Sequence, residues 1–170
     1  MPQQNNTFWY ETPRDMLAKL DREITSLSNI DPLDNHRKAD TVLNAAITAW
    51  QMADWVRTTM TAEQRDRLAN SCGMESDKTN ASFLDEFFRS NGNVHICRQL
   101  ATAGKHVQVT RHHDPYIQTK ASLFFDATTG QSALNWMISV DHRDTHVTVR
   151  EVLEGAHQYW QWLLDLLDGK

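Results

Sequence analysis

Cysteine is scarce in this chain, and the usual marks of a secreted or membrane protein are missing. The 170 residues contain two cysteines, Cys72 and Cys97, and no CxxC pair. They make no disulfide framework, so we expect both thiols to be unpaired. No apolar run approaches the ~20 residues of a membrane span, and the start MPQQNNTFWY lacks the basic and apolar parts of a signal peptide. The sequence therefore favours a cytoplasmic protein without a membrane partner.

The motifs of several common enzyme classes are also missing. The sequence contains no GxSxG, GxGxxG or GxxxxGK[ST], so it has no serine-hydrolase elbow and no glycine loop for a nucleotide phosphate. No spacing of cysteine and histidine matches a zinc site. His142 and His146 are four residues apart, but DHRDTH is typical of a turn that enters a strand. We predict neither a metal nor a cofactor.

Length and charge set further limits. A chain of 170 residues with 40% hydrophobic residues predicts one globular domain with one core, spanning 1–170. Residues 1–11 are expected to form an extended arm, pinned to the body by Phe8, Trp9 and Tyr10. The net charge of −5 argues against broad non-specific binding of nucleic acid, although it leaves room for a local basic patch.

Capping residues and apolar periodicity predict a helical protein. Thr12 with Pro13 starts a first helix, which ends at Ser28. The next helices are expected at 34–60, 61–70, 81–90 and 94–107. The wide apolar surface of 34–60, which includes Trp50, is typical of a central helix. The helix at 81–90 is expected to bury Phe83, Leu84, Phe87 and Phe88.

The pattern changes after residue 107. Alternating segments at 117–126, 133–140 and 146–149 predict three antiparallel strands. An amphipathic helix then runs over 150–168, with Trp162 as its exposed aromatic side chain. The expected fold class is mainly α (α+β): a helical bundle with a small three-stranded antiparallel meander before the C-terminal helix.

The helix at 94–107 carries the densest set of reactive groups. Ile96, Leu100, Ala103 and Val107 form one apolar stripe, and His95, Gln99, Thr102 and His106 repeat that spacing on another face. Arg98, Thr102 and Lys105 lie near one line, where an anion would sit with His106 at its edge. The alternative is a solvated helix face with one partly buried histidine.

Asp54 is the second candidate, because it continues a stripe of apolar residues on the preceding long helix. A carboxylate in such a stripe is costly to bury unless it is paired, and Arg98 is its expected partner. In a functional site, Asp54 would orient a catalytic arginine or histidine. In a structural reading, the pair is a buried ion pair, or the helix end simply turns toward water.

Two segments resemble known proteins. AWQMADW (49–55) and CRQLATAGKH (97–106) are similar to the AWxxxDW and CRxxAxxxKH segments of small bacterial helical proteins of unassigned function. The arginine and histidine on one helix also resemble the HEPN superfamily, helical bundles that include metal-independent ribonucleases of defence and toxin systems. This resemblance implies a homodimer that acts on RNA. His106 would assist proton transfer at the 2′-hydroxyl, Arg98 would stabilise the phosphate, and Asp54 would orient one of them.

Two hypotheses about function follow. One is a HEPN-like, nucleic-acid-directed enzyme or its inactive relative. The other is a non-catalytic helical interaction module that binds a partner protein, such as an accessory protein of a larger bacterial system. The feature that separates them is whether Arg98, His106 and Asp54 meet in one open cleft.

Overall fold

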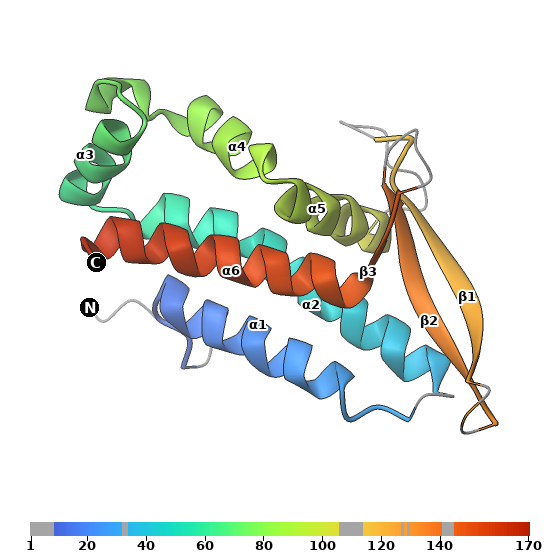
Figure 1. The fold of residues 1–170 in the computed structure, drawn as a ribbon. Coiled ribbons are helices and arrows are strands. Elements are labelled where there is room, and N and C mark those ends of the chain that lie inside the picture. The colour runs from blue at the N-terminus through green and yellow to red at the C-terminus, as the bar shows by residue number, and fades with distance from the viewer. Residues whose placement is uncertain (1–8, 32–33, 106–113, 127, 129, 141–144) are drawn as a thin grey trace.

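The computed structural model describes residues 9–31, 34–105, 114–126, 128, 130–140 and 145–170. Helices make up most of these residues, so the mainly α class is confirmed. Figure 1 shows α2 and α6 running through the middle of a bundle, with α1 on one side, α3, α4 and α5 on the other, and the strands at one end. No helix in the described ranges is both long and apolar enough to cross a membrane.

The first two helices begin where their caps predicted. In α1 (Pro13–Leu27), the Asp15 carboxylate accepts a hydrogen bond from the Thr12 N–H at 2.8 Å, and the Thr12 hydroxyl accepts one from the Asp15 N–H. This reciprocal capping box satisfies N–H groups that a helix start leaves free. Asp34 caps α2 (Asn35–Thr59). α2 contacts α1, α4, α5 and α6, which gives it the central position that its apolar surface predicted.

α3 (Ala62–Ser71) and α4 (Ala81–Ser90) lie on one side of the bundle. The short 3₁₀ helix η1 (Ser76–Lys78) connects them. Leu84 and Phe88 of α4 are buried, as predicted. Phe83 and Phe87 are only partly buried, so the expectation that all four apolar side chains are buried was wrong for these two. α4 packs against α5 and α2, and the side of α4 that carries Phe83 and Phe87 is only partly covered.

α5 (Gly92–Lys105) starts two residues before the predicted helix. The Asn91 side-chain oxygen accepts hydrogen bonds from the N–H groups of Asn93 and Val94, both at 3.1 Å. This cap explains the earlier start. Residues 106 and 107, which the prediction included, lie outside the described residues.

Three strands follow: β1 (Gln118–Asp126), β2 (Gln131–Val140) and β3 (Thr145–Thr148). They pair antiparallel in the order β1-β2-β3, with Leu123 opposite Leu134 and Ile138 opposite Val147. α6 (Val149–Asp168) continues directly from β3, because Thr148 is both the last strand residue and the helix cap.

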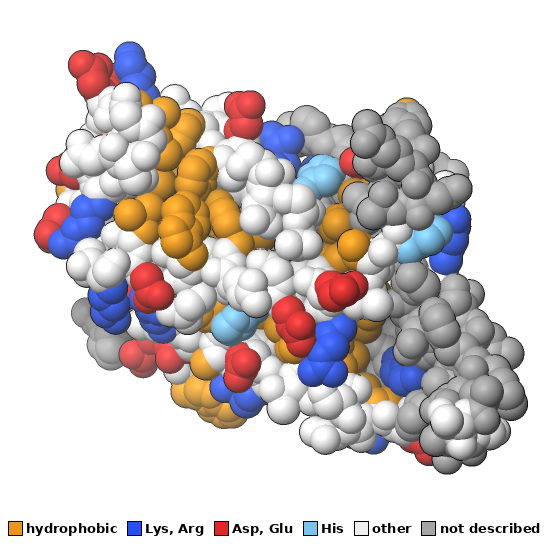
Figure 2. Space-filling model, viewed as in Figure 1, with side chains coloured by type: hydrophobic (Ala, Val, Ile, Leu, Met, Phe, Trp, Pro, Cys, Tyr) orange, Lys and Arg blue, Asp and Glu red, His pale blue; other side chains and the backbone are white. Residues whose placement is uncertain are grey.

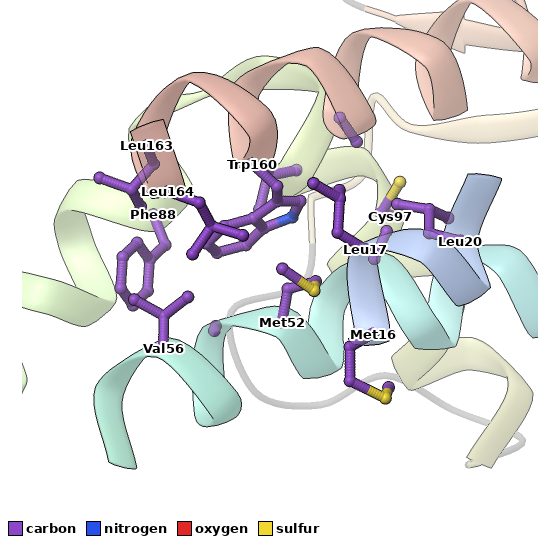
Figure 3. Packing of buried hydrophobic residues seen from close by; sticks show 14 of the residues in the cluster. Met16, Leu17, Leu20, Met52, Val56, Phe88, Cys97, Trp160, Leu163 and Leu164 are labelled. Atoms are coloured by element: carbon purple, nitrogen blue, oxygen red, sulfur yellow. The ribbon is translucent and has the colours of Figure 1, made fainter. Parts of the chain in front are cut away.

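The core lies between α1, α2, α4, α5 and α6 (Figure 3). Trp160 of α6 is fully buried at its centre, and its ring centroid is 5.2 Å from that of Phe88. The side chains that close around it come from α1, α2 and α6, and they include Leu17, Met52, Val56 and Leu164. Large buried side chains of this kind supply most of the apolar area that stabilises a bundle.

Two glycines let α5 lie close to its neighbours. A Cβ atom at Gly155 of α6 would be 2.1 Å from the side-chain nitrogen of Asn93, and one at Gly104 of α5 would be 2.7 Å from a methyl group of Leu43. α5 is therefore held close to α6 near its start and to α2 near its end. This placement decides which of its side chains reach solvent.

The N-terminal arm follows its prediction only in part. Tyr10 packs against the core, whereas Trp9 is 74% exposed. Phe8 lies outside the described residues. Trp50, which was expected to be buried in α2, is partly buried and packs against the edge of the core.

Candidate functional site

Arg98 lies on the interior side of α5. Only 9% of the residue is exposed, and its guanidinium carbon is 5.6 Å from the centroid of the Trp50 ring on α2. A cation in this position is attracted to the negative face of the ring. One turn later, the Thr102 hydroxyl donates a hydrogen bond to the Arg98 carbonyl at 2.8 Å. Both candidate anion-binding groups are thus engaged within the bundle.

Asp54 does not join Arg98, so the expected ion pair was wrong. The Asp54 side chain is 67% exposed and accepts a hydrogen bond from Arg57, one turn later on α2. The cause is the position of the stripe to which Asp54 belongs. Leu43 and Trp50 on that stripe are only half-buried, because the core side of α2 is the one that carries Ala49 and Met52. Asp54 lies at the end of this half-exposed stripe, so its side chain is exposed to solvent.

The remaining proposed groups stay untested predictions. Lys105 is the last residue of α5, but its side chain and His106 lie outside the described part of the chain. The described residues therefore contain Arg98 and Asp54 without the histidine that would complete a site with them. His95 of α5 has a partner that sequence reasoning missed: its Nε2 is 3.3 Å from the Asp114 carboxylate.

The burial of the two predicted faces of α5 differs in part from the prediction. Ile96 is buried as expected, but Ala103 is exposed and Gln99, assigned to the polar face, is buried. α5 contacts α2, α4 and α6, so its buried surface is wider than one stripe. A helix with neighbours on several sides also buries polar positions.

Four aromatic side chains form a continuous surface where α4 and α6 face each other, and we call it the aromatic surface. Its members are Phe83 and Phe87 of α4 and Tyr159 and Trp162 of α6. Their ring centroids follow at 5.7 Å from Phe83 to Phe87, 6.4 Å from Phe87 to Tyr159, and 5.7 Å from Tyr159 to Trp162. Figure 2 shows the apolar side chains that gather over these helices. Trp162 is 51% exposed, as the sequence predicted.

The Tyr159 phenol makes a hydrogen bond between the two helices of this surface. Its hydroxyl donates to the Phe87 carbonyl at 3.4 Å, which ties α6 to α4. Burial, followed by the nearby Cys72, raises the pKa of Tyr159 far above its ordinary value, so the phenol stays neutral. Cys72 is exposed and Cys97 is buried, and both are free, which confirms the prediction for the thiols.

Charged groups of both signs border the aromatic surface along α6. A shallow depression of about 560 Å³ is lined by residues that include Trp162, His157, Asp165 and Lys170. Hydrogen bonds from Gln161, and then the bond and charge of Arg14, lower the pKa of Asp165, so this carboxylate is ionised at neutral pH. The solvent face of α6 therefore combines an exposed indole with an anion and a cation.

Among the described residues, no group of three or more His, Cys, Asp or Glu side chains could hold a metal ion. In comparisons with known proteins, no family model, curated protein or solved structure matches this chain.

Proposed function

We propose that this protein is a non-catalytic helical interaction module that associates with a second copy of itself through the aromatic surface. The observation that carries this proposal is the continuous contact from Phe83 to Trp162, which ends in a half-exposed indole. Aromatic side chains are enriched at protein interfaces. Trp162 is 51% exposed, and the other three side chains are partly buried against the core.

The charge of the chain favours a protein over a nucleic acid at this surface. The net charge is −5, and the depression beside Trp162 is lined by Asp165 as well as by Lys170. Stacking of nucleic-acid bases on aromatic side chains normally occurs beside a positively charged groove. A partner that buries apolar area needs no such groove.

A second copy is the occupant that fits the border of the surface. In a twofold interface the same patch meets itself, so each charged group needs an opposite charge within the same patch. His157, Asp165 and Lys170 provide both signs beside Trp162. A carboxylate of one copy can face a cation of the other, which would steer the two copies into register.

Sedimentation equilibrium over a range of concentrations tests this proposal. We expect the wild-type chain to dimerise and Trp162→Ser to weaken dimerisation by ten-fold or more, since a buried interfacial tryptophan is worth roughly 2 kcal/mol or more. Trp9→Ser is the matched control, because Trp9 is also exposed but lies outside the aromatic surface. A monomeric wild type, or equal effects of the two substitutions, would overturn the proposal.

A second candidate is the HEPN-like, metal-independent ribonuclease, also a homodimer. Its support is the sequence resemblance and the position of Arg98 on the helix that precedes His106. Against it stand the contact of Arg98 with Trp50 and the exposure of Asp54. Cleavage of RNA in a chelator-containing buffer that disappears in His106→Ala, with unchanged stability, would favour this enzyme over the interaction module.

A further inference from the structure

A second feature lies at the end of the bundle where α1 and α3 begin and α2 and α6 end. A half-open cavity of about 320 Å³ lies there, between these four helix ends. Its apolar wall consists of core residues from two helices, Val56 and Met60 of α2 and Leu164 and Leu167 of α6. The volume is within the range of about 300–1,000 Å³ found for small-molecule sites. An apolar wall of this kind suits a compact apolar group.

The edge of the cavity is polar, and its charge is predominantly negative. Three charged residues line it: Glu11, Arg14 and Asp168. The Arg14 guanidinium already donates to the carboxylates of Asp165 and Asp168, both at 2.7 Å. Its positive charge is therefore matched by two carboxylates. The Lys170 ammonium is 3.8 Å from the Asp168 carboxylate, and the Glu11 carboxylate leaves the residues that line the cavity with a net negative charge.

The caps of the two helix starts at this edge weaken their attraction for an anion. Thr12 and Asp15 cap α1, and Thr61 and Gln64 cap α3 in the same reciprocal way. The capping side chains occupy N–H groups that would otherwise attract an anion. Hydrogen bonds from the N–H of Glu11 and from Thr12 also lower the pKa of Asp15, so it remains ionised. An anion would meet carboxylates here, whereas a cation would be attracted.

We propose that this cavity binds an organic cation with a compact apolar body, such as an aralkyl amine. The apolar part lies against Met60 and Leu164, and the ammonium group lies at the edge near Glu11. The cavity shares no residue with the aromatic surface. Arg14 of the cavity binds Asp165, which borders the aromatic surface. The two proposals are tested by separate measurements, so either can fail without the other.

A pair of ligands of opposite charge provides the test. Phenethylamine and phenylacetate carry the same ring, and each is titrated into the full-length wild-type protein while backbone amide signals are followed by NMR. We expect saturable shifts for phenethylamine at Thr12, Thr61 and Gln64, and affinity for phenylacetate about ten-fold weaker, because its charge is repelled at the edge. No saturable binding of the amine, equal affinity for both ligands, or shifts scattered over the molecule would overturn the proposal.

Two variants locate the site. Glu11→Gln should lower the affinity for phenethylamine about two- to five-fold, the effect of one exposed charge pair, with unchanged melting temperature. Asp21→Asn is the matched control, because it removes an exposed carboxylate of α1 outside the cavity. Thr59→Trp, which places a large side chain at the edge, should abolish binding of the amine. Unchanged binding of phenethylamine to Thr59→Trp would contradict this location. Equal losses of affinity in Glu11→Gln and Asp21→Asn would also contradict it.

Discussion

The guanidinium of Arg98 lies over the indole ring of Trp50, with 5.6 Å between the guanidinium carbon and the ring centroid. This contact joins α5 to α2. The Arg98 cation of α5 lies inside the bundle, and Asp54, one turn beyond Trp50 on α2, does not pair with it. The bond that Asp54 makes is to Arg57 on its own helix.

This contact predicts a measurable coupling. Trp50→Leu and Arg98→Met should each lower the free energy of unfolding, and the double variant should lose less than the sum by about 0.5–2 kcal/mol, the strength of a partly desolvated cation–π pair. Urea denaturation of the four proteins gives the coupling. Trp9→Leu, a change at an exposed tryptophan, should have an effect close to zero. Additive losses would show that the ring and the cation act independently.

Local signals in the sequence predicted the helices well. The caps at Thr12, Asp34, Thr61 and Asn80 bind helix-start N–H groups as expected. These interactions involve residues three apart in the chain, so their geometry follows from the sequence alone. The start of α5 was missed by two residues, because Asn91, which caps α5, directly follows the predicted helix at 81–90.

Contacts between helices could not be predicted in the same way. Periodicity shows that a side chain lies on an apolar stripe, but it does not show which neighbour covers that stripe. Asp54 and Phe87 illustrate this: each was expected to be covered, yet Asp54 is exposed and Phe87 is only partly buried. The aromatic surface was missed because Phe87 and Tyr159 are distant in sequence.

The Arg14 contacts predict a loss of stability in acid. The pKa of Asp165 lies below its ordinary value of 3.8, because Gln161 and Arg14 bind its ionised form. A carboxyl group whose pKa is lower in the folded state stabilises the fold above the unfolded pKa. That contribution is lost as the pH falls below about 3.8 and through the folded pKa. Urea denaturation between neutral pH and pH 3 measures the slope.

Asp165→Asn removes the titrating group, and it should flatten the acid limb of this pH dependence. If Asp165→Asn and wild type lose stability in parallel, the carboxylate does not contribute in this way.

The start of α6 depends on Thr148. Its hydroxyl accepts a hydrogen bond from the Glu151 N–H at 3.2 Å and donates one to the Glu151 carboxylate at 2.8 Å. Thr148→Ala should lower the free energy of unfolding by about 1 kcal/mol, the usual cost of losing a helix cap, whereas Thr148→Ser should retain most of the stability. Equal losses of stability in Thr148→Ala and Thr148→Ser would show that the effect comes from the place of Thr148 in β3 and not from the helix cap.

The thiols should differ sharply in reactivity. Burial raises the pKa of Cys97 to about 12, so its thiol stays neutral at physiological pH, whereas Cys72 is exposed. Since the thiolate is the reactive form, a disulfide reagent should modify one thiol in the native protein and two after denaturation. Rapid modification of Cys97 in the native state would contradict its burial.

Hydroxyl-radical footprinting at concentrations below and above the dimerisation midpoint tests the association most directly. Two exposed tryptophans serve as reporters in the same molecule, Trp162 in the aromatic surface and Trp9 outside it. We predict that oxidation of Trp162 falls as the dimer forms, while oxidation of Trp9 stays constant. Unchanged oxidation of Trp162 in a dimeric sample, or protection of Trp9 alone, would contradict association through the aromatic surface.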